Sequence, residues 1–515
     1  MTDILRKPDK SEIIYETEHR DAELDFIEKD NRLDVYITAE KSLPKFIVLR
    51  WNGSTDSRVS VLGDDWERSY GNLAWRGIEE NRFMPWYFMI SDGKMHTGYG
   101  VETGCNSFVS FEFDDNGITA WIDVRNGSFG VRLGGRKLLT CSFVCESYEG
   151  MSEFSALSDF CRRMCASPLC PPHPVYGGNN WYYAYGKSSR EEILGDTRLQ
   201  VRLSEGLENR PYMVIDDCWQ INSCAGPWQP NEKFGDMKAL AEEIKAAGAR
   251  PGIWVRFLHD RNMALPNGYY RDRIKYLLDP TVPEVLGYIE STIKRIKDWG
   301  FELIKHDFST NDIFESWGKE LNGSITKKRD LRFRDNTITN AEIVLKLYRT
   351  ILNAAGDTVI IGCNTVSHLS AGLVELYRTG DDTSGREWSR SRAYGVNTLA
   401  FRLCQNDAFY KVDADCVGII KDKIDWKLNR QWLDLLAKSG SPLFVSIQPE
   451  ALTEEMTKDL KEAFAVNSVQ KDTAEPLDWL FNNQPRFWAI NRVKTEYDFV
   501  MDSYPELLNS KIQPY

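Results

Sequence analysis

The amino-acid sequence predicts an α/β protein: a (β/α)8 barrel (a TIM barrel) preceded by an N-terminal β-sandwich domain and followed by a short C-terminal β region. Three observations favour this fold. Strand-like segments fill the first 150 residues, strand-like and helix-like segments alternate from 175 to 470, and a proline-rich stretch separates the two patterns. The length of 515 residues agrees, because it exceeds what one ordinary domain holds.

Residues 1–150 are predicted to form the β-sandwich domain. Several segments alternate apolar and polar residues, as half-buried strands do. Asn116 and Gly117 stand between two of them and favour a tight hairpin turn. The predicted strands are 33–40, 45–51, 85–92, 107–113, 118–124 and 137–147.

A helical linker is expected over 151–174, between the two patterns. Its first part, 153–165, reads as a helix, and its second part, 166–174, contains four prolines. Neither a helix nor a central strand tolerates such a stretch, so it indicates a boundary.

The barrel is predicted over 175–470, and the tail 471–515 is predicted to form a short β region. Helix-like patterns separate most of the barrel strands and are clearest at 237–248, 285–300 and 341–356. A doubly wound sheet is the alternative, but no glycine-rich phosphate-binding motif follows any strand. The predicted barrel strands are 175–181, 212–217, 250–257, 301–307, 358–364, 374–380, 409–415 and 441–447.

Composition excludes several classes of partner. The net charge of −12 disfavours nucleic acid, because an acidic surface repels phosphate backbones. No apolar run is long enough for a membrane span, and the N-terminus does not resemble a signal peptide. The 11 cysteines lack the paired spacing of a disulfide framework or a zinc site, which favours reduced thiols and a cytoplasmic location.

Polar residues recur where the predicted barrel strands end, which is where barrels gather their functional groups. Acidic residues at such positions also cap the following helix, so each one alone has that alternative explanation. Their recurrence at many strand ends favours a site. The residues in question are Asp216, Asp217, Lys305, Asp307, Asn364, Arg378, Asp381 and Asp382.

Two carboxylates around an oxocarbenium-like transition state are the groups that glycoside hydrolysis needs. Asp307 follows Lys305 by two residues on one strand, and a nearby cation favours the ionised carboxylate of a nucleophile. Asp382 stands beside Asp381, and a like charge tends to raise proton affinity, as an acid/base requires. The residues alone leave open which of these two faces the pocket.

The motifs along 175–465 resemble, in order, those of clan D glycoside hydrolases, families 27 and 36, the α-galactosidases and α-N-acetylgalactosaminidases. In-order recurrence is far more specific than any single motif. The matching segments are GGNNWYYAYG (177–186), IDDCW (215–219), GARPGIW (248–254), LIKHD (303–307), YRTGDD (377–382), DAD (413–415) and SPLFVS (441–446).

The resemblance implies a role for each matched residue. Asp307 would be the nucleophile and Asp382, four residues after Arg378, the acid/base. Asp216 and Asp217 would accept hydrogen bonds from the 4- and 6-hydroxyls of the sugar. The further substrate-binding residues would be Trp181, Trp254, Lys305 and Arg378.

Two more segments are candidates for contact with the sugar. The stretch 63–77 resembles the loop that family 36 N-terminal domains lend to the active site, so Asp65 and Trp66 could reach it; packing at the domain interface is the alternative for Trp66. The fifth strand departs from both families and reads GCNTVSH (362–368), which makes Asn364 and His368 candidates for reading the sugar's 2-position. A helix cap or an interface contact is the alternative for His368.

Together these features predict a retaining exo-α-glycosidase that hydrolyses terminal α-galactosides through a glycosyl-aspartate. The expected partner is an oligosaccharide or glycoconjugate substrate, no metal or organic cofactor is implied, and a homo-oligomer is compatible with the sequence. An α-N-acetylgalactosaminidase, a β-L-arabinopyranosidase or a transglycosylase stays open within the same chemistry. A carbohydrate-binding protein without catalysis is the alternative from another class, and a nucleotide-dependent oxidoreductase is disfavoured by the missing phosphate-binding loop.

Overall fold

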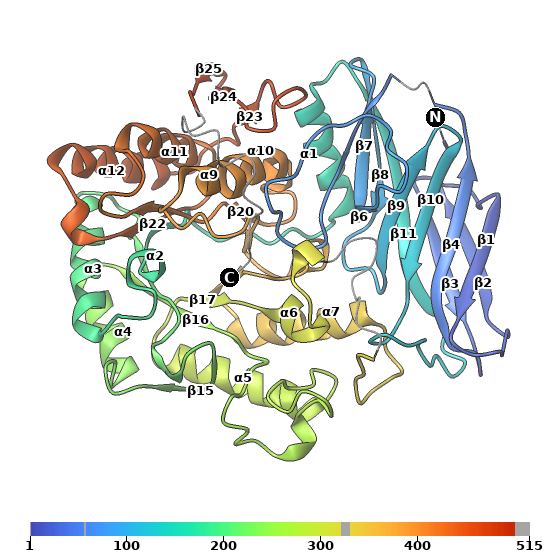
Figure 1. Cartoon of the computed structure of the whole chain (residues 1–515), viewed down its shortest axis with the longest axis horizontal. Coiled ribbons are helices and arrows are strands. Elements are labelled where there is room, and N and C mark those ends of the chain that lie inside the picture. Colours follow the sequence, from blue (N-terminus) through green and yellow to red (C-terminus); the bar gives the residue numbers. More distant parts are fainter. Residues whose placement is uncertain (1, 56–57, 321–329, 500–515) are drawn as a thin grey trace.

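The computed structural model describes residues 2–55, 58–320 and 330–499. Figure 1 shows antiparallel strands at one end of the molecule and a curled parallel sheet, covered by helices, at the other. The antiparallel strands form two sheets, ordered β1-β4-β10-β9-β6 and β2-β3-β11-β8-β7-β5. Their bounds are β1 (Lys10–Tyr15), β2 (Glu23–Lys29), β3 (Arg32–Thr38), β4 (Pro44–Asn52), β5 (Ser60–Gly63), β6 (Met84–Pro85), β7 (Tyr87–Ser91), β8 (Met95–Val101), β9 (Phe108–Asp114), β10 (Gly117–Asp123) and β11 (Leu138–Glu149).

The alternating pattern of these strands has the expected effect. In β10, the apolar residues at alternate positions from Ile118 to Ile122 are fully buried. The predicted hairpin joins β9 to β10, but its turn lies one residue earlier than predicted, at Asp115 and Asn116. Gly117 is the first residue of β10 and adopts a φ of 140°, where an added Cβ would lie 2.0 Å from the Trp51 carbonyl oxygen. Aromatic rings join the two sheets, as in the Trp51–Phe143 pair with centroids 5.2 Å apart.

The parallel sheet has nine strands in the order β20-β19-β18-β17-β16-β13-β12-β22-β21, and all of its pairings are parallel. Its two outermost strands are neighbours in the chain, separated only by Ala414 and Asp415. The sequence prediction treated this stretch as one strand ending at 415 and missed β21. The bounds are β12 (Tyr176–Asn179), β13 (Tyr212–Ile215), β16 (Arg250–Val255), β17 (Leu303–His306), β18 (Val359–Gly362), β19 (Leu376–Arg378), β20 (Lys411–Asp413), β21 (Cys416–Ile419) and β22 (Leu443–Ile447).

Amphipathic helices cover the outer face of this sheet (Figure 1). Their ends follow local capping rules: Thr339 and Glu342 form a capping box at the start of α7, and Gly248 ends α4 in the left-handed region with a φ of 108°. The principal helices are α3 (Arg190–Leu203), α4 (Met237–Ala247), α5 (Pro283–Asp298), α7 (Asn340–Ala355), α11 (Trp426–Lys438) and α12 (Glu454–Asn467).

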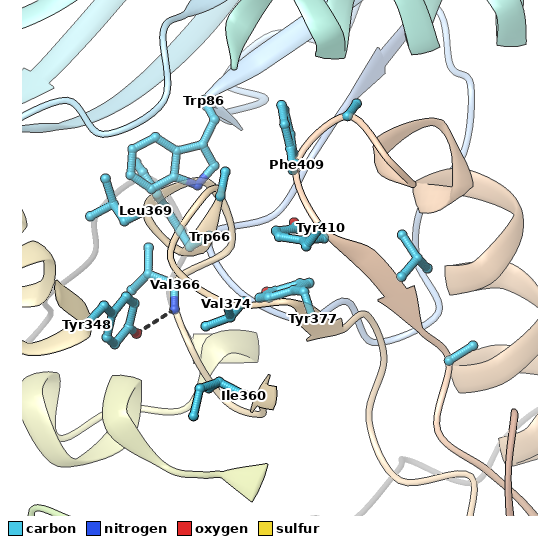
Figure 2. Packing of buried hydrophobic residues seen from close by; sticks show 14 of the residues in the cluster. Trp66, Trp86, Tyr348, Ile360, Val366, Leu369, Val374, Tyr377, Phe409 and Tyr410 are labelled. Carbon is cyan, nitrogen blue, oxygen red and sulfur yellow. Dashed lines mark hydrogen bonds between the residues drawn. The ribbon is translucent and has the colours of Figure 1, made fainter. Parts of the chain in front are cut away.

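The N-terminal sheets pack on the parallel-sheet part through an aromatic cluster (Figure 2). The Trp66 and Trp86 rings meet edge to face, with centroids 5.0 Å apart. Val366, which precedes the short helix α8 (Ser367–Ser370), packs in the same cluster and donates its N–H to the Tyr348 hydroxyl at 3.0 Å. The aromatic cluster holds Trp66, and the loop 64–72 that contains it lies against the carboxyl ends of the parallel strands.

The remaining elements agree with the sequence pattern. Helix α1 (Glu153–Met164) lies in the predicted helical linker, and β23 (Glu475–Pro476), β24 (Phe487–Ile490) and β25 (Val493–Glu496) form a small sheet in the predicted C-terminal region. The end of that region, 500–515, lies outside the described residues. None of the helices in the described parts of the chain combines the length and apolar character needed to cross a bilayer.

Candidate active site

The carboxyl ends of the parallel strands surround a cavity of about 160 Å³. Residues from several strand ends and loops line this cavity, although they are far apart in the sequence, from residue 68 to residue 382. Of the residues predicted from the sequence, those lining it are Trp181, Asp216, Asp217, Trp254, Lys305, Asp307, Asn364 and Asp382.

Asp307 follows the end of β17 and is only 6 % exposed. Its Oδ2 accepts a hydrogen bond from Trp254 Nε1 at 2.9 Å. Its Oδ1 accepts from Asn364 Nδ2 at 2.6 Å and from the backbone N–H of Phe308 at 2.7 Å. Because an ionised carboxylate only accepts hydrogen bonds, three N–H donors from three segments suit an anionic Asp307 held in one orientation.

Lys305 lies on β17, two residues before Asp307, and lines the same cavity, as strand alternation predicts. Its Nζ, however, pairs with Asp216 Oδ2 at 2.7 Å. Burial is the largest single influence and would lower the pKa of Lys305, but the surrounding negative charges, led by that of Asp216, together outweigh burial and raise that pKa well above its ordinary value. The cation expected beside the nucleophile is therefore shared with Asp216, which also accepts a bond from Asn179 Nδ2 at 2.7 Å.

Asp217 is enclosed by donors from the loop that follows it. Its Oδ1 accepts from Gln220 Nε2 at 2.6 Å, and its Oδ2 accepts from Ser223 Oγ at 3.0 Å. Cys224 adds its backbone N–H at 2.9 Å and its thiol, whose Sγ lies 3.0 Å from Oδ2. Both carboxylates of the Asp216–Asp217 pair are thus rigidly oriented at the cavity.

Asp382 lines the cavity, whereas its neighbour Asp381 does not. Its Oδ1 accepts from the Arg378 guanidinium at 3.0 Å, and its side chain is 39 % exposed. Arg68, from the N-terminal part of the chain, lies 3.8 Å from the same oxygen and pairs with Asp381 at 3.0 Å. Of the two candidates for the acid/base, Asp381 and Asp382, only Asp382 presents its carboxylate to the cavity.

The electrostatics of Asp382 correct the sequence expectation. The neighbouring Asp381 was expected to raise its proton affinity. Desolvation does oppose ionisation, but the charges of Arg378, Arg68 and Lys305 outweigh it, so the pKa of Asp382 lies below its ordinary value. Without a ligand, Asp382 is therefore an ionised carboxylate.

Arg378 is buried and does not line the cavity. Its guanidinium is 2 % exposed and reaches Asp415 at 2.6 Å as well as Asp382. The structure therefore places Arg378 against the carboxylates, not against the space where a sugar hydroxyl would lie.

Three further predicted residues also lie outside the cavity. His368 is buried at the contact with the N-terminal sheets, where its Nε2 lies 2.9 Å from the Val101 carbonyl oxygen and its ring stacks on Trp86 at 5.1 Å. Trp66 packs in the same cluster, and Asp65 is half-buried beside it, with a pKa that desolvation raises to about 6. The contact with the N-terminal sheets, which was the alternative explanation for His368 and Trp66, is the one the structure shows.

Arg68 is the main residue that the sequence reasoning missed. Its loop pairs with the end of β19: Ser69 donates its N–H to the Thr379 carbonyl at 2.7 Å, and Asp381 donates its N–H to the Ser69 carbonyl at 3.2 Å. This pairing carries Arg68 into the cavity. The loop itself was identifiable in the sequence, but which of its side chains turns inward was not. The other lining residues missed are Cys224, Phe308, Trp317 and Cys363.

Two residues beside Asp307 have left-handed backbone conformations. Phe308 has a φ of 65° and Asn364 a φ of 50°, and both donate to Asp307. Non-glycine residues seldom adopt such angles, and they persist where the surroundings hold them, often at functional sites. Among the described residues, no group of three or more histidine, cysteine or acidic side chains could hold a metal ion.

By sequence, no protein family and no curated protein matches the chain. Solved structures do match. The chain is similar to TtGalA, an α-galactosidase from Thermus thermophilus, with a TM-score of 0.63 and 16 % identity over 90 % of this chain and 97 % of that one. It is also similar to the family 36 α-galactosidase AgaA from Geobacillus stearothermophilus, with a TM-score of 0.60 and 15 % identity over 91 % and 70 % of the two chains. The α-galactosidase from Lactobacillus brevis matches with a TM-score of 0.56 and 12 % identity over 89 % and 70 %.

The chain has the fold of these α-galactosidases. That finding confirms the resemblance in fold that the ordered motifs predict.

Proposed function

We propose that this chain is a retaining exo-α-glycosidase that hydrolyses terminal α-galactosides. The observation that carries the proposal is the presence of Asp307 and Asp382 on one small cavity, beside the oriented pair Asp216 and Asp217. A cavity of about 160 Å³ suits a single terminal sugar ring. The shared fold supports it, and TtGalA has been solved in complex with p-nitrophenyl α-D-galactopyranoside.

In the first step, a carboxylate oxygen of Asp307 attacks the anomeric carbon and the glycosidic bond breaks. The proton on Asp382 passes to the leaving oxygen, which yields the free aglycone and a glycosyl-aspartate ester. In the second step, Asp382 accepts a proton from water, the water oxygen attacks the anomeric carbon, and the ester bond to Asp307 breaks. The sugar is released with its configuration retained.

The acid role requires Asp382 to acquire a proton when substrate binds. Its half-exposed carboxylate loses water when a sugar fills the cavity, and desolvation favours the neutral form. The carboxylates of Asp216 and Asp217 accept hydrogen bonds from hydroxyl groups of the sugar. Because several protein donors fix the orientation of these carboxylates, their remaining lone pairs can accept only from a hydroxyl at a matching position, which favours discrimination between epimers.

The proposal is tested with Asp307→Gly and Asp382→Gly on an aryl α-galactoside with a good leaving group. Both lose turnover, by roughly 10²–10⁴-fold for the acid/base. Azide then separates the roles. With Asp382→Gly it attacks the galactosyl-enzyme and gives the α-galactosyl azide, whereas with Asp307→Gly it attacks substrate directly and gives the β-galactosyl azide.

Asp381→Asn is the matched control, because Asp381 is the adjacent carboxyl and does not line the cavity. Its turnover should stay within about tenfold of the parent. Near-normal turnover in Asp307→Gly, or a greater loss in Asp381→Asn than in Asp382→Gly, contradicts these assignments.

We also propose two finer features of the fold. The parallel sheet is a closed (β/α)8 barrel whose seventh strand is interrupted at Ala414 and Asp415; the two-residue link between its outermost strands supports this. The two N-terminal sheets form a β-sandwich, which the aromatic contact between Trp51 and Phe143 supports.

A further inference from the structure

The segment Asp413–Asp415 follows a buried strand, yet the mechanism proposed above uses none of its residues. Asp415 lies in the two-residue link between β20 and β21 and has a left-handed φ of 72°. Its side chain is 3 % exposed and does not line the cavity. A carboxylate is costly to bury unless it is paired, and a residue other than glycine seldom keeps such a φ unless its surroundings hold it. The contacts of Asp415 account for both features.

One oxygen of Asp415, Oδ2, gathers four donors. It accepts hydrogen bonds from the backbone N–H of Thr383 at 2.8 Å and from the Thr383 hydroxyl at 2.9 Å. The hydroxyl of Tyr182, in helix α2 (Trp181–Ala184), donates to the same oxygen. The Arg378 guanidinium completes the set at 2.6 Å. Because an ionised carboxylate only accepts hydrogen bonds, this arrangement suits an anionic Asp415.

Arg378 divides one terminal nitrogen between two carboxylates. Its Nη2 lies 2.6 Å from Asp415 Oδ2 and 3.0 Å from Asp382 Oδ1. Burial would lower the pKa of Arg378, but the surrounding negative charges raise that pKa, and Asp415 contributes more to the rise than Asp382 does. Asp415 therefore takes the larger share of this cation, and Asp382 is only partly neutralised by it.

Asp415 also fixes the backbone next to Asp382. Thr383, which gives Asp415 two of its hydrogen bonds, directly follows Asp382 in the chain. Two residues further on, Gly385 packs so closely on β21 that an added Cβ would lie 2.4 Å from the Gly418 Cα. The segment that carries Asp382 is thus attached to the strand that begins directly after Asp415.

Other charged and titratable groups also act on Asp382. The cations around it are Arg378, Arg68, Lys305 and Arg390. The groups that oppose these cations are Asp381, Asp413, Asp415 and Tyr182. Desolvation favours the neutral form of Asp382, and Arg378 is the cation that opposes desolvation most strongly and lowers the pKa of Asp382. Because Asp415 pairs with Arg378, it can moderate that influence.

We propose that Asp415 is a positioning residue for the acid/base: it holds the Arg378 guanidinium partly away from Asp382 and fixes the backbone at Thr383, so that Asp382 can take up a proton and deliver it to the leaving oxygen. This role rests on the proposed function, because it acts through Asp382 as the acid/base. Without the charge of Asp415, Arg378 would pair fully with Asp382 and favour its ionised form.

The test compares Asp415→Asn in the full chain with the parent on two aryl α-galactosides, one with a good and one with a poor leaving group. The amide oxygen can accept the same hydrogen bonds, so the charge is removed while the shape is kept. For the poor leaving group, the falling limb of kcat reports the acid form of Asp382 in the substrate complex and should move to lower pH by about 0.5–1 unit. At pH 7, kcat should fall by about three- to tenfold for the poor leaving group and by less than about twofold for the good one, which needs little help from a proton.

Tyr182→Phe is the matched control, because it removes one donor to the same oxygen and changes no charge. The falling limb of its kcat profile should stay at the pH of the parent, whatever the change in kcat itself. Asp415→Asn combined with Arg378→Gln removes the anion and the cation together, so the limb should move to higher pH, because Asp382 has lost its principal cation. Since this double variant leaves neither member of the ion pair behind alone, it decides the question if Asp415→Asn does not fold.

The outcomes separate this role from the proposed function. The role is overturned by an unmoved limb or equal losses on the two leaving groups in Asp415→Asn, by the same shift in Tyr182→Phe, or by a double variant whose limb does not move to higher pH. Each of these results leaves the proposed function intact. A parent chain that hydrolyses no α-galactoside overturns the proposed function and, with it, the role of Asp415.

Discussion

The cavity at the strand ends and the contact with the N-terminal sheets share two segments of the chain, yet the two regions have opposite character. The segment 64–68 sends Arg68 into the cavity and Trp66 into the contact. The segment 364–368 sends Asn364 into the cavity and His368 into the contact. The two segments are joined where Ser367 donates its N–H to the Trp66 carbonyl at 3.0 Å. Residues two to four positions apart therefore have different roles. Arg68 and Asn364 face the charged groups of the cavity, whereas Trp66 and His368 pack in the contact.

The largest expected difference between the two regions is in catalysis. Asn364→Asp removes the Nδ2 donor from Asp307 and puts a second carboxylate beside it, so kcat/KM for an aryl α-galactoside should fall by about 10³-fold. His368→Gln keeps a polar side chain in the contact and should change kcat/KM by less than about twofold. Steady-state kinetics of the two purified variants check this.

Equal losses in the two variants would contradict the separation of cavity and contact. Asn364→Ser is an informative intermediate, because it removes the amide donor without adding a charge. Its kcat should recover part of the loss seen with the aspartate.

The two regions should rank in the opposite order when stability is measured in place of activity: a substitution at His368 should destabilise the protein more than one at Asn364. His368→Ala removes a fully buried ring that stacks on Trp86 and bonds to the Val101 carbonyl, so the free energy of unfolding should fall by about 2–3 kcal/mol. Asn364→Ser should cost less, because its site borders a cavity that solvent can fill. Urea unfolding followed by tryptophan fluorescence measures both, and a larger loss in Asn364→Ser would refute the packing role of His368.

Much of both regions follows from local patterns in the sequence. Asp216, Asp217 and Asp307 come directly after buried strands, Asp382 follows the end of β19 by four residues, and parallel strands bring their carboxyl ends together. Asn364 could be predicted on the same ground. The helices and most strands followed from apolar spacing and capping residues, because these depend only on near neighbours.

What could not be predicted depends on contacts between distant segments. Whether Trp66 or Arg68 turns inward is decided by the pairing of Ser69 with the end of β19, which no local pattern encodes. The low pKa of Asp382 has the same origin only in part: Arg378, four residues away, makes the largest favourable contribution, and Arg68, more than 300 residues away in the chain, adds to it. His368 has a chemically versatile side chain, but helix α8 directs it towards Trp86.

Arg68 offers a sharper test of how the N-terminal loop acts on the cavity. Removing its charge in Arg68→Met weakens the electrostatic stabilisation of the Asp382 carboxylate, so the pKa of Asp382 should rise. Because the first step needs the acid form, kcat/KM falls as pH rises through that pKa, and the falling limb should move to higher pH. Arg68→Lys keeps the positive charge, so the falling limb of its kcat/KM profile should stay at the pH of the parent. In both variants, kcat at the optimal pH should change by less than about tenfold. A limb that does not move in Arg68→Met would mean that Arg68 only fills space.

The smallest expected effect is the pH dependence that His368 gives to the contact. Burial lowers the pKa of His368 to about 4, against an ordinary value of 6.5. The unfolded chain therefore binds the proton more readily, so this contribution to stability is complete above pH 6.5 and declines as pH falls towards 4. Between pH 7 and pH 6 the contribution of His368 to the free energy of unfolding falls by about 0.5–1 kcal/mol.

Glu375, whose pKa burial raises to about 7, changes stability in the opposite sense over the same range. The pH dependence of the parent chain alone therefore does not isolate the contribution of His368. The difference between the parent and His368→Phe does, and that difference in unfolding free energy should shrink by this amount at pH 6 if the neutral ring holds the contact.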